Sequence, residues 1–270
     1  MKFNINIFTS TGNTKWTLDK LRGYFVDSGH KVRVFDSVAC GDDWVEDCDM
    51  LGFIYPIWGS SIPKPQLDSI DQLADSEGQK VFLFGNAGMD AWDTGSFIRK
   101  KLKAKGYDVV YAANVILPMN SSFPGLQFIK KRAPEKSALM LEYAEHTIKK
   151  AVTDILEEKR YFECKGFLNR IGGTFIRMVY KLFVNAFKKT YYVDQEKCNG
   201  CGICYSICPV GAISMNDSKA AIDIGKCIFC LKCYNFCPQT AVLKGKRSAD
   251  SDKYPRYRGL DGNYKPTKYR

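Results

Sequence analysis

The chain has 270 residues and a formal net charge of +11, and 45% of its residues are hydrophobic, which suffices for globular domains with cores of their own. It begins MKFNINIF, without the apolar run and cleavage site of an export signal. We therefore expect a cytoplasmic location and not a secreted, disulfide-stabilised protein. No Ser/His/Asp triad or pair of catalytic carboxylates can be argued from the sequence, so no catalytic residue is assigned.

The first part of the chain alternates strand-like and helix-like segments. Residues 13–29 have apolar side chains at helical spacing and end at a glycine. The strand-like runs are 2–10, 31–37, 50–56, 80–86 and 107–118. This alternation predicts an α/β fold with a doubly wound parallel sheet. Ligands of such sheets bind beyond the carboxyl ends of the strands, so the loops at that edge are candidate binding sites.

The loop after the first strand, FTSTGNT, lacks the glycine fingerprints of nucleoside triphosphate and dinucleotide sites and is rich in hydroxyl groups. Hydroxyls, an amide side chain and backbone N–H groups at a helix N-terminus can surround a phosphate monoester. The candidate phosphate-binding residues are Thr9, Ser10, Thr11, Gly12, Asn13 and Thr14. The alternative is an ordinary strand-to-helix turn capped by Asn13 or Thr14.

This loop resembles the FMN phosphate loop of flavodoxins, where an S/T-x-T-G-N-T turn follows the first strand. The resemblance implies a flavodoxin-like, five-stranded parallel sheet in the order 2-1-3-4-5, with FMN as cofactor. It also implies that two loops, YPIWGSSIPKP and GNAGMDAWDTG, hold the flavin ring. The residues implied to contact the flavin are Pro56, Trp58, Gly59, Asn86, Gly88 and Trp92.

Trp58 and Trp92 are the candidates for stacking on the flavin ring, with simple packing as the alternative for each. In flavodoxins a peptide flip beside the ring stabilises the semiquinone, and the resemblance transfers this role to the Trp58–Gly59 peptide. The alternative is that Gly59 only eases a turn. The loop departs from short-chain flavodoxins at Gly85-Asn86, where glycine-aspartate is usual.

The positive charge lies outside the expected cofactor domains. Residues 1–160 carry 21 basic and 21 acidic side chains, whereas 161–197 and 244–270 have net charges of +4 and +6. Basic segments near a redox centre steer acidic proteins toward it, so an acidic ferredoxin or reductase is the expected partner.

The segment 161–190 mixes aromatic and aliphatic residues with Arg and Lys. Interfacial amphipathic helices share this composition, so binding to a membrane surface is one interpretation. The favoured one is a pair of helical segments packed between the domains, because no apolar stretch reaches transmembrane length.

Eight cysteines follow the pattern C-x2-C-x2-C-x3-C-P twice, and each cysteine of the second motif lies 29 positions after its counterpart. Disulfides are not expected in an intracellular chain, and zinc sites usually have two ligand pairs with a longer spacer. The spacing is that of bacterial iron–sulfur proteins, so two [4Fe-4S] clusters are predicted. The ligands are Cys198, Cys201, Cys204, Cys208, Cys227, Cys230, Cys233 and Cys237.

Residues 191–243 therefore resemble a bacterial two-cluster ferredoxin, an α+β domain. In that family the fourth cysteine of each motif binds the other cluster. The resemblance implies one cluster on the first three cysteines of the first motif and Cys237. It implies a second cluster on the first three cysteines of the second motif and Cys208.

Nearly the whole chain resembles flavodoxin–ferredoxin fusion proteins. The expected organisation is an FMN-binding domain at 1–160, a basic helical linker at 161–190, a two-cluster domain at 191–243 and a basic tail at 244–270. The tail has few aliphatic residues, so a docking or disordered segment without a core of its own is expected, and a nucleic-acid partner is not.

The leading interpretation is an electron-transfer protein of anaerobic metabolism that relays single electrons between two [4Fe-4S] clusters and FMN. One alternative is an FMN-dependent reductase of a small acceptor such as a quinone, nitro compound or disulfide, which would need an open pocket over the flavin. Another is a redox subunit docked on a membrane surface. A homodimer is compatible with each of them.

Overall fold

The computed structural model describes residues 1–124, 134–163 and 166–270, which form two compact units. The first unit contains Met1–Thr9, Asn13–Met119 and the described part of Arg132–Val179. The second contains Ser10–Gly12, the described part of Asn120–Lys131, and Tyr180–Arg270.

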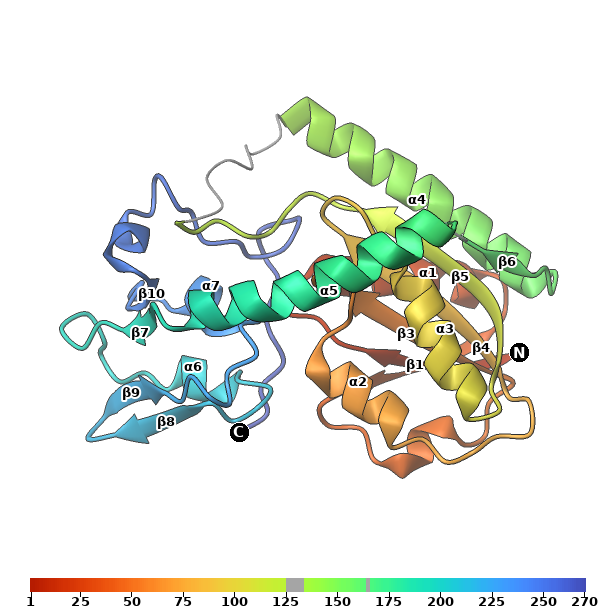
Figure 1. The fold of residues 1–270 in the computed structure, drawn as a ribbon, viewed down its shortest axis with the longest axis horizontal. Helices are drawn as coiled ribbons and strands as arrows, with labels where there is room; N and C mark the ends of the chain where they lie inside the picture. Colours follow the sequence, from red (N-terminus) through yellow and green to blue (C-terminus); the bar gives the residue numbers. More distant parts are fainter. Residues whose placement is uncertain (125–133, 164–165) are drawn as a thin grey trace. The chain divides into compact units, whose positions relative to one another are not determined.

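A parallel sheet of six strands forms the centre of the first unit (Figure 1). Its order is β2-β1-β3-β4-β5-β6, and each neighbouring pair is parallel. The strands are β1 (Lys2–Ile7), β2 (Lys31–Asp36), β3 (Met50–Pro56), β4 (Lys80–Ala87), β5 (Asp108–Ile116) and β6 (Tyr161–Phe162). The order 2-1-3-4-5 of the first five strands is that of flavodoxin-like folds, as predicted.

The prediction of five strands was wrong by one, because the chain adds β6 at the edge of the sheet. Tyr161 and Phe162 pair with Tyr111 and Ala112 of β5. The Glu163 carboxylate then accepts hydrogen bonds from the backbone and the side-chain amide of Asn114. Two aromatic residues at the start of the expected linker carry no alternating pattern long enough to predict a strand.

Helices cover both faces of the sheet, as a doubly wound fold requires. Residues of α1 (Asn13–Asp27) and α4 (Pro134–Leu156), such as Phe25 and Ile148, pack with Phe3 and Phe82 from the strands. On the other face, residues of α2 (Lys64–Asp71), α3 (Thr94–Ala104) and the short helix η1 (Asp42–Val45) pack with Leu51, Phe53 and Leu83. Strand side chains alternate between these two cores, so one face holds Phe82 and the other Leu83.

The second unit is built on the repeated cysteine motif. Its elements are β7 (Tyr191–Val193), α6 (Ile203–Ser206), β8 (Ile213–Asn216), β9 (Lys219–Ile222), α7 (Lys232–Phe236), β10 (Val242–Lys244) and η2 (Lys246–Ala249). β7 pairs with β10 and β8 pairs with β9, both antiparallel. The short helices α6 and α7 lie at equivalent places of the two repeats, inside the cysteine motifs, so the α+β expectation holds.

The linker contains one continuous helix, α5 (Phe167–Lys188), in place of the expected pair of helical segments. Two adjacent glycines, Gly172 and Gly173, do not interrupt it, although glycine costs about 1 kcal/mol in a helix interior. Within the described residues, neither α5 nor any other helix has the length and apolar character needed to cross a bilayer.

The tail after η2 has no further helix or strand, but it packs closely on the cysteine-rich domain. Tyr254 is buried, and the Arg256 guanidinium stacks 3.5 Å from the Tyr234 ring centroid. The Tyr269 backbone N–H donates to the Ser206 carbonyl, and the Arg270 guanidinium donates to the Cys208 carbonyl. Aromatic and cationic side chains thus do the packing that the missing aliphatic residues would otherwise do.

Candidate redox centres

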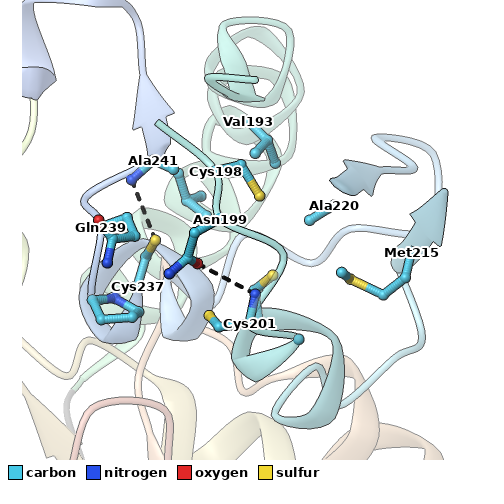
Figure 2. Close-up of a pocket in the computed structure, with 13 residues that line it drawn as sticks. Val193, Cys198, Asn199, Cys201, Met215, Ala220, Cys237, Gln239 and Ala241 are labelled. Atoms are coloured by element: carbon cyan, nitrogen blue, oxygen red, sulfur yellow. Dashed lines mark hydrogen bonds between the residues drawn. The ribbon is translucent and has the colours of Figure 1, made fainter. Parts of the chain in front are cut away.

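The first three cysteines of one motif and the last cysteine of the other meet at a single cavity. Cys198, Cys201, Cys204 and Cys237 all line it, and apolar residues such as Val193 complete the wall. Figure 2 shows the labelled cysteines of this set around the hollow. Burial is the main cause that raises the pKa of the Cys204 thiol to about 11, and the other three cysteines raise it further.

The remaining cysteines form a second group of the same composition. Burial raises the pKa of the Cys233 thiol well above its usual range, and Cys230, Cys227 and Cys208 act in the same direction. Burial likewise raises the pKa of Cys230 to about 12. Each group of four therefore combines three cysteines of one repeat with the last cysteine of the other.

The donor sets fit iron–sulfur clusters, because four cysteines are grouped in each case. The wall of the first cavity is also largely apolar, although Cys201 itself is exposed. Among the described residues, no group of three or more His, Cys, Asp or Glu side chains is spaced to hold a single metal ion. The raised pKa values mean that the thiols of Cys204, Cys230 and Cys233 are protonated at neutral pH, so binding of metal to them would release protons.

The two repeats share an unusual backbone conformation. Gly200 and Gly202 have φ of +74° and +70°, and Phe229 and Leu231, 29 positions later, have φ of +56° and +64°. The Ala212 and Ala241 N–H groups donate to Cys208 Sγ and Cys237 Sγ, each over 3.2 Å. Glycine adopts this left-handed conformation readily, but the second repeat adopts it at an aromatic and an aliphatic residue.

We expect alanine to be less well tolerated at Gly200 than at Gly202. Both positions have positive φ, which costs a non-glycine residue about 1–2 kcal/mol. A Cβ at Gly202 meets nothing within 4 Å, whereas one at Gly200 would lie 2.1 Å from the Ser218 carbonyl oxygen. Thermal unfolding of the iron-loaded chain measures the difference, and equal losses in the two variants would contradict it.

Several groups that contact the cysteines were not predicted from the motif. The Tyr191 hydroxyl lies 3.0 Å from Cys233 Sγ, inside the core of this domain. Lys188 Nζ donates to the Cys227 carbonyl over 2.7 Å, and Lys219 Nζ donates to the Cys198 carbonyl. Hydrogen bonds and positive charges near the sulfurs tune cluster potentials. None is visible in the spacing, because each lies at least 21 positions from its partner.

The hydroxyl-rich loop of the first unit ends in the first turn of α1. Thr9 and Thr14 are buried, and Thr9 Oγ1 has no hydrogen-bond partner. The Asn13 amide donates to the Pro118 carbonyl over 2.9 Å. A buried hydroxyl without a partner is costly, and a phosphate oxygen would satisfy it. The chemistry of this loop therefore fits a phosphate group.

Residues 10–12 of this loop belong to the second unit. Ser10 and Thr11 are buried, and the Asn120 amide donates to Thr11 Oγ1. Gly12 has φ of +106°, and a Cβ there would lie 2.7 Å from the Tyr264 ring. Glycine at this position therefore serves both the turn and the close approach of the tail.

Residues 58–61 form a β-turn with two central residues, which follows the end of β3 at Pro56. Trp58 and Ser61 exchange two backbone hydrogen bonds, and Gly59 and Ser60 between them have φ of +55° and +59°. These values are those of a type I′ turn. The Trp58 ring packs edge-on against Phe8 at 5.8 Å between centroids.

The end of β4 and the loop after it contact α1, α5 and Met119. The Asn86 side chain accepts a hydrogen bond from Thr17 over 2.7 Å, and Gly88 lies against Met119. Trp92 has φ of +48°, and its ring lies so close to Gly172 of α5 that a Cβ there would be 2.6 Å from it. Flavin contacts of Trp58, Asn86, Gly88 and Trp92 stay predictions.

A polar cluster joins both loops to α5 and was missed by sequence reasoning. Arg177 donates two hydrogen bonds to the Asp93 carboxylate, over 2.5 and 3.0 Å, and a third to the Ser60 carbonyl. The Ser60 hydroxyl donates to Asp93 as well. Gly173 allows the contact, because a Cβ there would lie 1.9 Å from Asp93 Oδ1. The cluster fixes α5 to the loops after β3 and β4.

Residues 190–251 match the family model described as a 4Fe-4S dicluster domain, which agrees with the cysteine geometry. The chain thus joins an α/β unit with the flavodoxin-like strand order to a segment similar to 4Fe-4S dicluster domains. No curated protein sequence matches it.

Solved structures are similar over the N-terminal part. The two-electron-reduced flavodoxin of Megasphaera elsdenii is 20% identical, over 57% of this chain and 99% of that chain, with a TM-score of 0.41. The FMN-bound flavodoxin of Fusobacterium nucleatum is 15% identical, over 59% and 99%, with a TM-score of 0.42. An azoreductase of Bacillus anthracis is 11% identical, over 57% and 99%, also at 0.42. The strand order, rather than these similarities, establishes the flavodoxin-like fold.

Proposed function

We propose that this chain is an electron carrier that holds two [4Fe-4S] clusters and one FMN, and that it exchanges electrons between them. The observation that carries the proposal is the convergence of four cysteines at each of two places, in a chain that also has a flavodoxin-like unit. Clusters transfer one electron at a time and flavins one or two, so the combination couples the two kinds of transfer.

The residues of the chain supply binding sites and water exclusion. Cys198, Cys201, Cys204 and Cys237 hold one cluster, and the other four motif cysteines hold the second. The loop Thr9–Thr14 binds the FMN phosphate through its hydroxyls and backbone N–H groups. Support for this role comes from the unpaired, buried hydroxyl of Thr9.

The turn at Trp58–Ser61 adapts to the flavin ring through its central peptide. The Trp58 carbonyl accepts the Ser61 N–H over 3.1 Å, so rotation of the Trp58–Gly59 peptide would break that bond. Rotation of the Gly59–Ser60 peptide leaves both bonds that close the turn intact. The flexible peptide is therefore the one after Gly59, one position later than the sequence resemblance implies.

The test is anaerobic purification with analysis of iron, sulfide and flavin, followed by rapid reduction with dithionite. About eight irons and one FMN per chain are expected. Reduction of the clusters should be followed by loss of the flavin absorbance at a rate that does not depend on protein concentration, because the electrons move within one chain or one fixed assembly. A chain without flavin, or a flavin that never exchanges electrons with the clusters, would refute the proposal.

The same experiment separates a carrier from an enzyme. A carrier returns its electrons to an acidic ferredoxin or reductase, in line with the positive charge of the segments 161–197 and 244–270. A reductase of small acceptors would instead be reoxidised rapidly by a quinone, nitro compound or disulfide. A cytoplasmic location belongs to this proposal, and protection of the chain from protease added outside intact cells checks it, whether or not the chain also binds the membrane.

Thr9→Val is expected to weaken FMN binding without weakening the fold. Valine keeps the shape of threonine and removes a hydroxyl that has no partner in the protein. A hydrogen bond to a charged phosphate contributes about 2 kcal/mol, so the dissociation constant should rise roughly 30-fold. Titration of the flavin-free chain with FMN, followed by fluorescence, measures it.

Ser37→Ala is the matched control for this variant. Ser37 is also buried in a loop after a strand of the same sheet, but its hydroxyl donates to Asn6 Oδ1 over 2.6 Å. Its loss should lower the thermal stability and leave FMN affinity unchanged. Unchanged FMN affinity in Thr9→Val would remove this hydroxyl from the phosphate site.

A further inference from the structure

Helix α5 exposes an apolar stripe along most of its length. The stripe consists of Leu168, Ile171, Phe175, Met178 and Leu182, which recur every three or four residues and therefore share one face. Their exposed fractions lie between 54% and 81%. Fourteen residues of helix separate its ends, which corresponds to a ridge about 21 Å long. An exposed apolar patch of this extent marks an interaction surface.

The charges of α5 restrict what this surface binds. The 22 residues of the helix include no Asp or Glu, but they include Arg170, Arg177, Lys181 and Lys188. A second copy of the chain would bring two such helices together without an acidic side chain on either to offset the repulsion. An anionic surface suits the helix better.

A basic cleft adjoins the stripe within the first unit. It has a volume of about 500 Å³ between α3 and α5. The cationic residues that line it are Arg99, Lys100, Lys103, Arg170 and Arg177. The one carboxylate of the lining, on Asp93, is already bonded to Arg177. Arg99 Nε is buried there without a hydrogen-bond partner, although its guanidinium stacks on the Phe162 ring.

The cleft and the stripe are neighbours on the helix. The cleft residues Arg170, Thr174 and Arg177 each precede a stripe residue by one position, which places them about 100° around the axis. An apolar ridge beside a cationic cleft matches the boundary of a bilayer, where acyl chains lie next to phosphate headgroups. Because no described helix can cross a bilayer, α5 would lie in the interface plane.

We propose that α5 docks the protein on membranes that contain anionic phospholipid, with the stripe among the acyl chains and the basic cleft on headgroup phosphates. Neither part depends on the cofactor sites, so the proposal stands or fails separately from the proposed function. Only together with the proposed function does it place electron exchange at a membrane surface.

The test is flotation of the full, cofactor-loaded chain with vesicles of phosphatidylcholine, alone or mixed with phosphatidylglycerol. Binding is expected to the mixed vesicles only, and added salt should weaken it. The triple variant Leu168→Gln, Phe175→Gln and Leu182→Gln should lose at least about tenfold in affinity, because three large side chains no longer enter the apolar layer. Lys100→Gln with Lys103→Gln should lose about fivefold for each charge removed.

The matched control is Leu139→Gln with Tyr143→Gln, which removes two exposed apolar side chains from α4 and should leave binding unchanged. Unaltered far-UV circular dichroism shows that each variant is folded. The proposal is overturned by binding to neither vesicle, by equal binding to both, or by wild-type affinity of the triple variant. It is also overturned if the chain is a dimer that the triple variant converts to monomers.

Discussion

The double variant Cys204→Ala, Cys237→Ala is expected to retain one [4Fe-4S] cluster, whereas Cys233→Ala, Cys237→Ala is expected to retain none. Cys204 and Cys237 line the same cavity although they belong to different motifs. Cys233 and Cys237 belong to the same motif, but Cys233 is grouped with Cys208, Cys227 and Cys230. The first pair thus removes two ligands of one cluster, and the second pair removes one ligand from each.

Iron analysis of the anaerobically reconstituted chains distinguishes these outcomes. We expect about eight irons per chain in the wild type, about four in the first variant and few in the second. EPR of the reduced chains should show magnetic coupling between two clusters in the wild type only. Cys48→Ala is the control, because that thiol lies outside both groups and donates only to the Val45 carbonyl.

The opposite pattern would mean that each motif holds its own cluster. In that case Cys233→Ala, Cys237→Ala would keep about four irons and Cys204→Ala, Cys237→Ala would lose both clusters. Equal iron in the two double variants would contradict both arrangements. The pairing can be decided in this way because the two variants share Cys237 and differ only in its companion.

The cysteine ligands of the clusters were predictable because they lie at short, regular spacings in the sequence. The motif places three cysteines within seven positions, and the repeat makes the second site a copy of the first. The flavodoxin-like sheet was predictable for a similar reason, because hydrophobic runs such as 50–56 and 80–86 are long and separated by helix signals. The short pair Tyr161–Phe162 gave no such signal, and the sixth strand was missed.

The contacts that were not predicted join residues distant in sequence. The stacking of Trp92 on a flavin stays a prediction, and nothing in the sequence places the Trp92 ring beside Gly172, 80 positions later. The tail has few aliphatic residues, and its order depends on contacts such as that between Arg256 and the Tyr234 ring. The composition of a segment indicates whether it can form a hydrophobic core of its own. It does not indicate whether the segment packs on the core of a neighbouring domain.

The most consequential of these distant contacts is the ion pair between Arg177 and Asp93. The two side chains are 16% and 7% exposed, so the charges are largely removed from water. The geometry is bidentate, and Ser60 supplies further partners to both groups. Breaking a buried pair by removing one partner leaves the other charge buried and unpaired, which costs about 3–5 kcal/mol.

Arg177→Met is therefore expected to loosen both loops at once. Asp93 loses its cationic partner and Ser60 loses a donor to its carbonyl, so residues 58–61 and 91–95 should exchange backbone hydrogens much faster. Hydrogen exchange read by mass spectrometry measures this locally, which suits a chain of two units that need not unfold together. Exchange in the cysteine motifs should not change.

Two companion variants show whether the charge pair is responsible. Arg177→Lys keeps the charge but cannot make the bidentate contact, so it should fall between wild type and Arg177→Met. Arg177→Met combined with Asp93→Asn removes both charges, and much of the protection should return because no ion stays buried without a partner. If the double variant exchanges as fast as Arg177→Met alone, the loss comes from packing against Phe97, 4.7 Å from the guanidinium, rather than from the unpaired carboxylate. The loops that the sequence assigns to the flavin ring would then be held by the packing of Arg177 on Phe97 and not by its ion pair with Asp93.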